Sequence, residues 1–197
     1  RLVSDLLEEA GAALVLHSAR PELIRTSRLA YERIERPGEL DGFVEIVRAC
    51  RDEYVLDAVR AGRQLVETNC RLTFLAPALA VAYPGSSFVH IVRHPAEIVT
   101  SGARRGWWSG SHDHDVGRIV PLAGSPEAER WASSGFVERV GFLWRETARF
   151  VERFAAGSGA GRVSLVQAER LFADAHVAVA VMAACRIDPL PEERIAR

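Results

Sequence analysis

The residues best suited to binding an anion follow the most strand-like segment of the sequence. Residues 87–92 read Ser-Phe-Val-His-Ile-Val, and Arg93 comes directly afterwards, ahead of a helix that Pro95 is expected to begin. A guanidinium there adds its charge to the positive end of the helix dipole and the free N–H groups of the first turn. Ser101 lies eight residues after Arg93, where its hydroxyl can reach the same phosphate. The alternative is that Arg93 pairs with Glu97 and Ser101 only packs.

Predicted elements place this site at the edge of a sheet. Helical patterns cover residues 1–10, 21–31, 42–61, 69–83, 136–155 and 171–184, besides the helix from Pro95. Strand patterns cover residues 12–16, 64–67, 87–92 and 163–166. This alternation predicts an α/β fold of three layers, with a mostly parallel central sheet, as a single domain over residues 1–197. Ligands of such sheets bind at the carboxyl ends of the strands.

The amino-acid composition limits the kinds of ligand and the kinds of anion site that the protein can have. The 25 basic residues are all arginine, against 26 acidic ones, so the net charge of −1 does not suggest a nucleic-acid or membrane-surface binder. Without lysine, an anion site must use arginine, hydroxyls and backbone N–H groups. Three widely spaced cysteines favour a reducing, cytoplasmic setting. No apolar run is long enough for a membrane span, and no signal peptide is recognised.

A family resemblance assigns roles to these residues. The stretch Tyr-Pro-Gly-Ser-Ser-Phe-Val-His-Ile-Val-Arg-His-Pro at 83–95, followed by Ile-Val-Thr-Ser at 98–101, resembles the conserved strand, turn and helix of PAPS-dependent sulfotransferases. In that family the arginine and the serine eight residues later hold the 3′-phosphate of the donor, which implies the same for Arg93 and Ser101. The family's aspartate after the arginine is His94 here.

The resemblance continues on both sides of this stretch. Glu67-Thr68-Asn69 is similar to the E-K-[ST] segment of the bacterial and Golgi-type branch, which implies that Glu67 is the general base; the family's lysine is Thr68. Alternatively, Glu67 is a helix-end charge beside the cap residue Asn69. Downstream, Trp144 and residues 168–171 (Ala-Glu-Arg-Leu) resemble the family's tryptophan helix and its v-x-YEdL turn, with Ala168 in place of the tyrosine.

One part of the family pattern is missing from residues 1–197. The family binds the donor's phosphosulfate with a G-x-x-[RK]-S-G-T loop, and no such loop occurs in this sequence. Residues 1–10 look like the helix that should follow the loop, so the loop and its strand are expected upstream of Arg1. The resemblance implies a P-loop NTPase-like sulfotransferase fold. If no loop precedes Arg1, a degenerate scaffold is favoured.

Other candidate residues carry competing interpretations. His112, Asp113, His114 and Asp115 alternate metal-ligand types, but no third convergent ligand is evident, and no metal is expected. Residues 107–126 read as a long loop over the acceptor, whose two tryptophans, at 107 and 108, either face a sugar or lipid or simply pack.

Two histidines and three arginines lie close to the predicted strands and helix ends. His17 and His90 are expected to be structural, and Arg71 either orients Glu67 or works against its role as a base. Arg104 and Arg105 either extend the phosphate site or complement the helix dipole.

The leading hypothesis is transfer of a sulfuryl group from PAPS to a hydroxyl or amine of a small-molecule, sugar or lipid acceptor. No metal is required, because in-line transfer depends on positioning and electrostatic stabilisation. The alternatives are a P-loop kinase-like enzyme using ATP and Mg²⁺, or a non-catalytic sulfotransferase-like domain. Nothing in the sequence excludes an oligomer.

Overall fold

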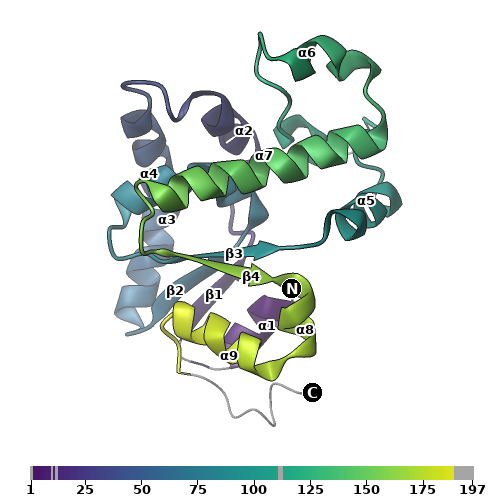
Figure 1. The fold of residues 1–197 in the computed structure, drawn as a ribbon. Helices are drawn as coiled ribbons and strands as arrows, with labels where there is room; N and C mark the ends of the chain where they lie inside the picture. The colour runs from purple at the N-terminus through teal and green to yellow at the C-terminus, as the bar shows by residue number, and fades with distance from the viewer. Residues whose placement is uncertain (1, 10, 12, 111–112, 189–197) are drawn as a thin grey trace.

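The structure, a computed structural model, describes residues 2–9, 11, 13–110 and 113–188, and its helices and strands alternate along the chain (Figure 1). The strands are β1 (Ala13–His17), β2 (Gln64–Thr68), β3 (Phe88–Val92) and β4 (Val163–Gln167). The helices are α1 (Leu2–Glu9), α2 (Ile24–Arg33), α3 (Leu40–Arg60), α4 (Ala76–Ala82), α5 (Pro95–Arg104), α6 (Pro126–Arg130), α7 (Phe136–Ala156), α8 (Ala168–Ala173) and α9 (Ala175–Ala184). Short 3₁₀ helices are η1 (Cys70–Leu75), η2 (Asp113–Gly117) and η3 (Trp131–Ser133).

The strands form two parallel pairs. β1 pairs with β2 in a register that sets His17 opposite Thr68, and β3 pairs with β4 in a register that sets Val92 opposite Gln167. The predicted mixed α/β class and parallel pairing are confirmed. The described strands belong to two two-stranded sheets, so a single central sheet with its three layers stays a prediction.

Helices cover both faces of the β3–β4 pair, with α7 on one side and α9 on the other (Figure 1). Because side chains alternate along a strand, Phe88 packs with Phe154 of α7, and its neighbour Val89 packs with Val181 of α9. The ring centroids of Phe88 and Phe154 lie 5.1 Å apart, edge to face. The largest core cluster lies among α2, α3, η1, α4 and α7, around Val47, Leu75 and Phe150.

Two helix predictions were wrong. The segment 69–83 is not one helix with Pro77 inside: Asn69 caps η1 by accepting from the N–H of Arg71, and Pro77 lies in the first turn of α4, where its missing N–H costs nothing. The segment 171–184 is likewise divided, because the side chain of Asp174 accepts from the N–H of His176 and caps a new helix, α9. In addition, α2 begins at Ile24 rather than at Pro21.

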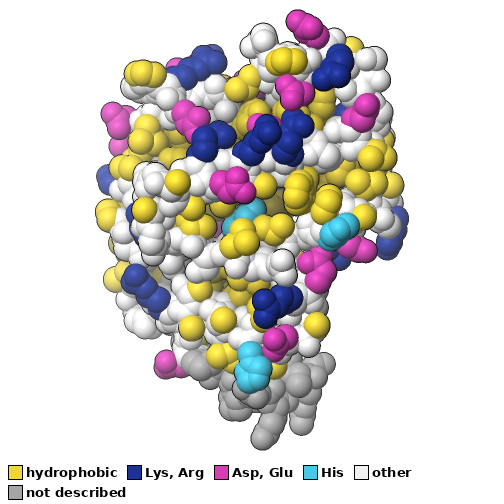
Figure 2. Space-filling model, viewed as in Figure 1, with side chains coloured by type: hydrophobic (Ala, Val, Ile, Leu, Met, Phe, Trp, Pro, Cys, Tyr) yellow, Lys and Arg dark blue, Asp and Glu magenta, His cyan; other side chains and the backbone are white. Residues whose placement is uncertain are grey.

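Positively and negatively charged side chains are mixed on the face of the molecule drawn in Figure 2. Figure 2 shows arginine side chains gathered along α7, with acidic side chains beside them. Three of these arginines form ion pairs at 3.1–3.3 Å: Arg145 with Glu127 and Glu146, Arg149 with Glu146, and Arg153 with Glu35. In the part of the chain that the structure describes, no helix has the length and apolar character that crossing a bilayer requires.

Candidate functional site

The turn between β3 and α5 carries the predicted phosphate-binding arginine. Arg93 follows the last residue of β3, and α5 begins at Pro95, as predicted. His94 is the N-cap: its Nδ1 accepts a hydrogen bond from the N–H of Ala96 at 3.3 Å. The side chain of His94 therefore caps the start of α5, as an aspartate or asparagine does at many helix N-termini.

Two distant side chains hold this turn. The indole Nε1 of Trp144 donates to the carbonyl of Arg93 at 3.0 Å, and the N–H of His94 donates to Oε1 of Glu169 at 2.8 Å. Trp144 belongs to α7 and Glu169 to the first turn of α8, directly after β4. Hydrogen bonds to α7 and α8 thus hold the backbone of Arg93 and His94 in place, and this fixes the position from which the guanidinium extends.

The side chain of Arg93 is accessible. It is 46% exposed, and its nearest acidic group, Glu97, is 3.8 Å away and 56% exposed. This is the pairing that the alternative interpretation expected. An ion pair this long and exposed contributes little, so it does not prevent the guanidinium from meeting a phosphate.

Ser101 lies on α5, half-buried, two turns after Arg93. Its neighbour Gly102 is where α5 meets the following loop and α7: a Cβ built there would lie 2.8 Å from the ring of Trp107 and 3.2 Å from that of Phe136. Only glycine allows this approach. Arg93 and Ser101 therefore lie on one continuous segment, from the end of β3 through α5, whereas Glu67 lies near the end of β2, in the other strand pair.

Gly102→Ala is expected to lower the free energy of unfolding by about 1–3 kcal/mol, because the methyl group forces Trp107 and Phe136 apart. Gly141→Ala is the matched control: it lies within α7, is exposed, and its Cβ would meet nothing within 4 Å. That change should be stabilising by about 0.5–1 kcal/mol, because alanine is the better helix former. Urea denaturation of both variants tests the pair. Equal effects would show that the contact at Gly102 is not tight.

Glu67 is held by a buried arginine. Its Oε2 accepts from Nε of Arg51 at 2.7 Å, its Oε1 accepts from Nη2 of the same guanidinium at 3.0 Å, and Oε1 also accepts from the side chain of Asn69 at 2.9 Å. Arg51 is 2% exposed, and Glu67 is 10% exposed. Three of the roughly four acceptor positions of the carboxylate are therefore occupied, and Oε2 accepts only one of these bonds.

The sequence analysis did not predict that Arg51 is the partner of Glu67. The same guanidinium donates to the carbonyls of Ala19, Pro21 and Cys50, so Arg51 ties the chain after β1 to the end of β2. A signal was present, because Arg51 follows Val44 and Val47 at helical spacing on the buried face of α3. A charged residue on such a face requires a buried partner. The arginine expected beside Glu67, Arg71, instead donates to Glu22.

A polar cluster joins the carboxyl ends of β1 and β2. The hydroxyl of Thr68 lies 2.9 Å from Nδ1 of His17 and 2.6 Å from the hydroxyl of Ser4, which is buried in α1. His17 is therefore hydrogen-bonded, as a structural histidine should be. His90 is partly buried within β3, and burial lowers its pKa.

The bond from the His94 N–H holds the pKa of the Glu169 carboxyl below its ordinary value of 4.5. A lowered folded-state pKa means that the contact is complete above pH 4.5 and is lost as the pH falls through the lowered value. Acidification below pH 4.5 should therefore release the His94 amide, seen as a shift of its ¹H–¹⁵N signal. Glu169→Gln should abolish this pH dependence. A His94 signal that titrates equally in both proteins would contradict the assignment.

The predicted loop over the acceptor is packed by its own aromatic residues. The guanidinium of Arg118 lies 3.9 Å from the ring centroid of Trp107 and 5.3 Å from that of Trp108. Trp108 also meets Trp131 and Phe136 edge to face. Both tryptophans are half-buried. This geometry supports the interpretation that they pack the loop, and leaves part of each ring accessible.

The acidic and histidine residues of this loop do not form a described metal site. Asp115 is engaged by Arg118, with Nε donating to Oδ1 at 2.8 Å. His112 lies outside the described residues. The side chains of Asp113 and His114 are not described either, and among the side chains that are described no group of three or more His, Cys, Asp or Glu residues could hold a metal ion.

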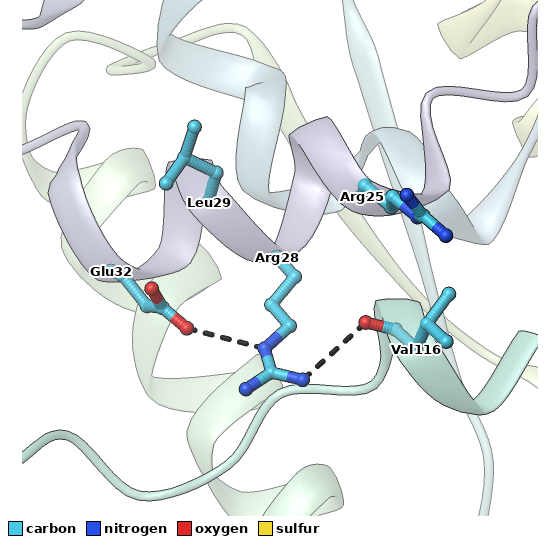
Figure 3. Close-up of a pocket in the computed structure, with 5 residues that line it drawn as sticks. All are labelled: Arg25, Arg28, Leu29, Glu32 and Val116. Atoms are coloured by element: carbon cyan, nitrogen blue, oxygen red, sulfur yellow. Dashed lines mark hydrogen bonds and ion pairs between the residues drawn. The ribbon is translucent and has the colours of Figure 1, made fainter.

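A hollow lies elsewhere in the described part of the chain, between α2 and η2. It has a volume of about 330 Å³ and is lined by Arg25, Arg28, Leu29, Glu32 and Val116 (Figure 3). Arg28 donates to Glu32 and to the carbonyl of Val116, as the dashed lines show. None of the predicted site residues lines this hollow, so it identifies no ligand of the β3–α5 turn.

Comparisons with known proteins add no assignment: no family model matches the sequence, and no curated protein or solved structure matches it. The structure therefore assigns this chain to a fold class and not to a protein family. The chain is a mixed α/β protein with two parallel strand pairs and an arginine-bearing turn after β3.

Proposed function

We propose that this chain belongs to a sulfotransferase that uses PAPS as donor and acts on a hydroxyl or amine of a small-molecule, sugar or lipid acceptor. One observation carries the proposal. Three segments that resemble sulfotransferase stretches meet at one turn, since Trp144 and Glu169 both bind the backbone at Arg93 and His94. They are separated by 51 and 75 residues in sequence, so their meeting is independent of the local resemblance.

In this proposal Arg93 and Ser101 hold the 3′-phosphate of the nucleotide. The half-exposed guanidinium supplies the charge and the fork of donors, and the hydroxyl of Ser101 supplies a further donor. The first N–H groups of α5 are already bonded within the turn, to Glu169 and to His94. Glu67 is the candidate base. The fold is the P-loop NTPase-like sulfotransferase fold, with no metal. The free cysteines Cys50, Cys70 and Cys185 fit a reducing cytoplasm.

A nucleotide-binding domain without turnover is the second candidate. The observation in its favour is the ion pair of Glu67, whose two oxygens already accept hydrogen bonds from Arg51. A carboxylate fastened in this way has a structural role that needs no acceptor. Both candidates predict the same nucleotide site, and they differ in whether sulfate is transferred.

Titration with adenosine 3′,5′-bisphosphate tests the shared site. We expect binding by calorimetry, and an affinity about 10–150-fold lower for adenosine 5′-phosphate, because charge-assisted hydrogen bonds contribute about 1.5–3 kcal/mol. The two ligands differ only in the 3′-phosphate. Equal affinities would refute the site, and preference for Mg²⁺-ATP would favour the kinase-like alternative. Sulfate transfer from PAPS to a panel of acceptors then separates the enzyme from the binding domain.

A further inference from the structure

The hollow between α2 and η2 shares no lining residue with the proposed nucleotide site. Its volume of about 330 Å³ is at the lower end of the range found for sites that bind small molecules. One wall belongs to α2 and the other to η2 (Figure 3), and the hollow is lined by Arg25, Arg28, Leu29, Glu32 and Val116. It therefore combines two cations, one anion and two apolar side chains.

The two walls of the hollow are held against each other. A Cβ built at Gly117 of η2 would overlap Cγ2 of Ile24 and lie 2.7 Å from the carbonyl oxygen of Ile24, the first residue of α2. Only glycine permits this approach. Nη1 of Arg28 also donates to the carbonyl of Val116 at 3.4 Å. Two elements in direct contact thus bound the hollow, and its shape does not depend on one projecting side chain.

One of the two arginines is already neutralised. Nε of Arg28 donates to Oε1 of Glu32 at 3.2 Å, and these side chains are 35% and 33% exposed. A guanidinium has five N–H donors, and the described contacts of Arg28 use one at Nε and one at Nη1. Arg28 therefore has N–H groups left for a ligand, although Glu32 balances its charge.

The charge of Arg25, by contrast, is not balanced. Arg25 is exposed, and it forms no ion pair with the side chains that the structure describes. In Figure 3 its guanidinium lies apart from the bonded pair of Arg28 and Glu32. Of the residues three or four positions away, only Glu22 is acidic, and Glu22 accepts from Arg71. The hollow therefore has a net positive charge.

Apolar side chains adjoin these cations. Leu29 is 39% exposed and Val116 is 46% exposed. A single exposed apolar side chain is ordinary on a protein surface. Here, however, two of them line the same concave surface as Arg25 and Arg28, one from each wall. A ligand that fills the hollow would remove both from water while its charged group meets the arginines.

We infer that this hollow binds a small organic acid, a molecule with one carboxylate beside an apolar group. Arg25 supplies the unbalanced charge, and Arg28 supplies further N–H donors. Leu29 and Val116 supply the apolar contact. One unbalanced charge matches the single charge of a carboxylate better than the larger charge of a phosphate monoester. A cation is a poor occupant, because Arg28 already binds the carboxylate of Glu32.

Titration of ¹⁵N-labelled protein with 4-phenylbutyrate tests this inference. The comparison is 4-phenylbutan-1-ol, which has the same apolar part and no charge. The acid should shift the ¹H–¹⁵N signals of Arg25, Leu29 and Val116, with a dissociation constant on the order of millimolar for so small a ligand. The alcohol should bind about tenfold more weakly, because it makes no charge-assisted hydrogen bond.

Three variants separate the contributions. Arg25→Ala should weaken binding of the acid by about tenfold and bring it level with the alcohol. Arg33→Ala is the matched control, because Arg33 lies in the last turn of the same helix, outside the hollow, and is 47% exposed. Its effect should stay below about twofold, since salt screens distant charges. Val116→Ser should weaken the acid and the alcohol alike, because both lose the same apolar contact.

Three results would overturn the inference. One is that the acid leaves these signals unshifted up to its solubility limit. Another is equal affinity for the acid and the alcohol, or equal losses for Arg25→Ala and Arg33→Ala. The third is displacement of the acid by adenosine 3′,5′-bisphosphate, which would place the acid at the β3–α5 turn. The inference does not depend on the proposed function: a protein that binds the acid but not the bisphosphate would support it and refute the nucleotide site.

Discussion

Arg51→Ala is expected to lower the free energy of unfolding by about 3–5 kcal/mol, the usual effect of breaking a buried ion pair from one side. The change leaves the carboxylate of Glu67, which is 10% exposed, without its bidentate partner. It also removes the donor to the carbonyls of Ala19, Pro21 and Cys50. Since small domains are stable by about 5–15 kcal/mol in total, the variant should be close to unfolding at 37 °C. Urea denaturation at 25 °C measures the effect.

Arg60→Ala is the matched control for this prediction. Arg60 lies on the same helix, α3, and pairs with Asp57 at 3.6 Å, but the two side chains are 72% and 61% exposed. Its removal should change stability by no more than about 0.5 kcal/mol. If the double variant Arg51→Met with Glu67→Leu recovers most of the stability lost in Arg51→Ala, the cost came from the stranded charge. Similar losses for Arg51→Ala and Arg60→Ala would contradict the buried pair.

Glu67→Gln separates the two possible roles of the carboxylate. Glutamine keeps an oxygen for Arg51 and most of the packing, so the variant should fold and bind nucleotide. A general base contributes about 10²–10⁴-fold to the rate, and a loss of this size with unchanged nucleotide affinity assigns Glu67 to the reaction. Unchanged turnover in an active protein would restrict Glu67 to its structural contact with Arg51.

Arg93→Ala is expected to weaken binding of adenosine 3′,5′-bisphosphate by about 10–150-fold, because it removes charge-assisted hydrogen bonds of about 1.5–3 kcal/mol. The affinity for adenosine 5′-phosphate should hardly change, since that ligand has no 3′-phosphate. Stability should stay within about 0.5 kcal/mol, as the side chain is 46% exposed and its contact to Glu97 is long. Calorimetric titration of both ligands measures this difference.

Arg104→Ala is the control for charge. Arg104 lies in the last turn of the same helix and is exposed, so the variant has the same net charge as Arg93→Ala. Its affinity for the bisphosphate should fall by less than threefold. Arg93→Lys should bind with intermediate affinity, because lysine keeps the charge but lacks the planar fork of donors. Equal losses at Arg93 and Arg104 would show that the phosphate senses only the overall charge.

Much of the local structure was predictable from neighbouring residues. The strand at 88–92, the helix beginning at Pro95, the long helix near 136–155 and the cap at Asn69 all appear as expected. Caps, turns and helical periodicity depend on residues within four positions of one another, so a single sequence specifies them. The misplaced boundaries are also local, because Pro77 lies in the first turn of α4 and Asp174 caps α9, whereas each had been expected inside a longer helix.

The partners of the site residues were decided only by tertiary structure. Placement and spacing identified Arg93 and Ser101 as candidates to bind phosphate, and the family resemblance added Glu67 as the candidate base. They did not reveal that Arg51 holds Glu67, that Trp144 and Glu169 fasten the Arg93 turn, or that the strands divide into two pairs. Such contacts join elements that approach only when their apolar faces pack. The sequence by itself determines which residues could bind or react. Which of them come into contact depends on how the helices and strands pack around a common core.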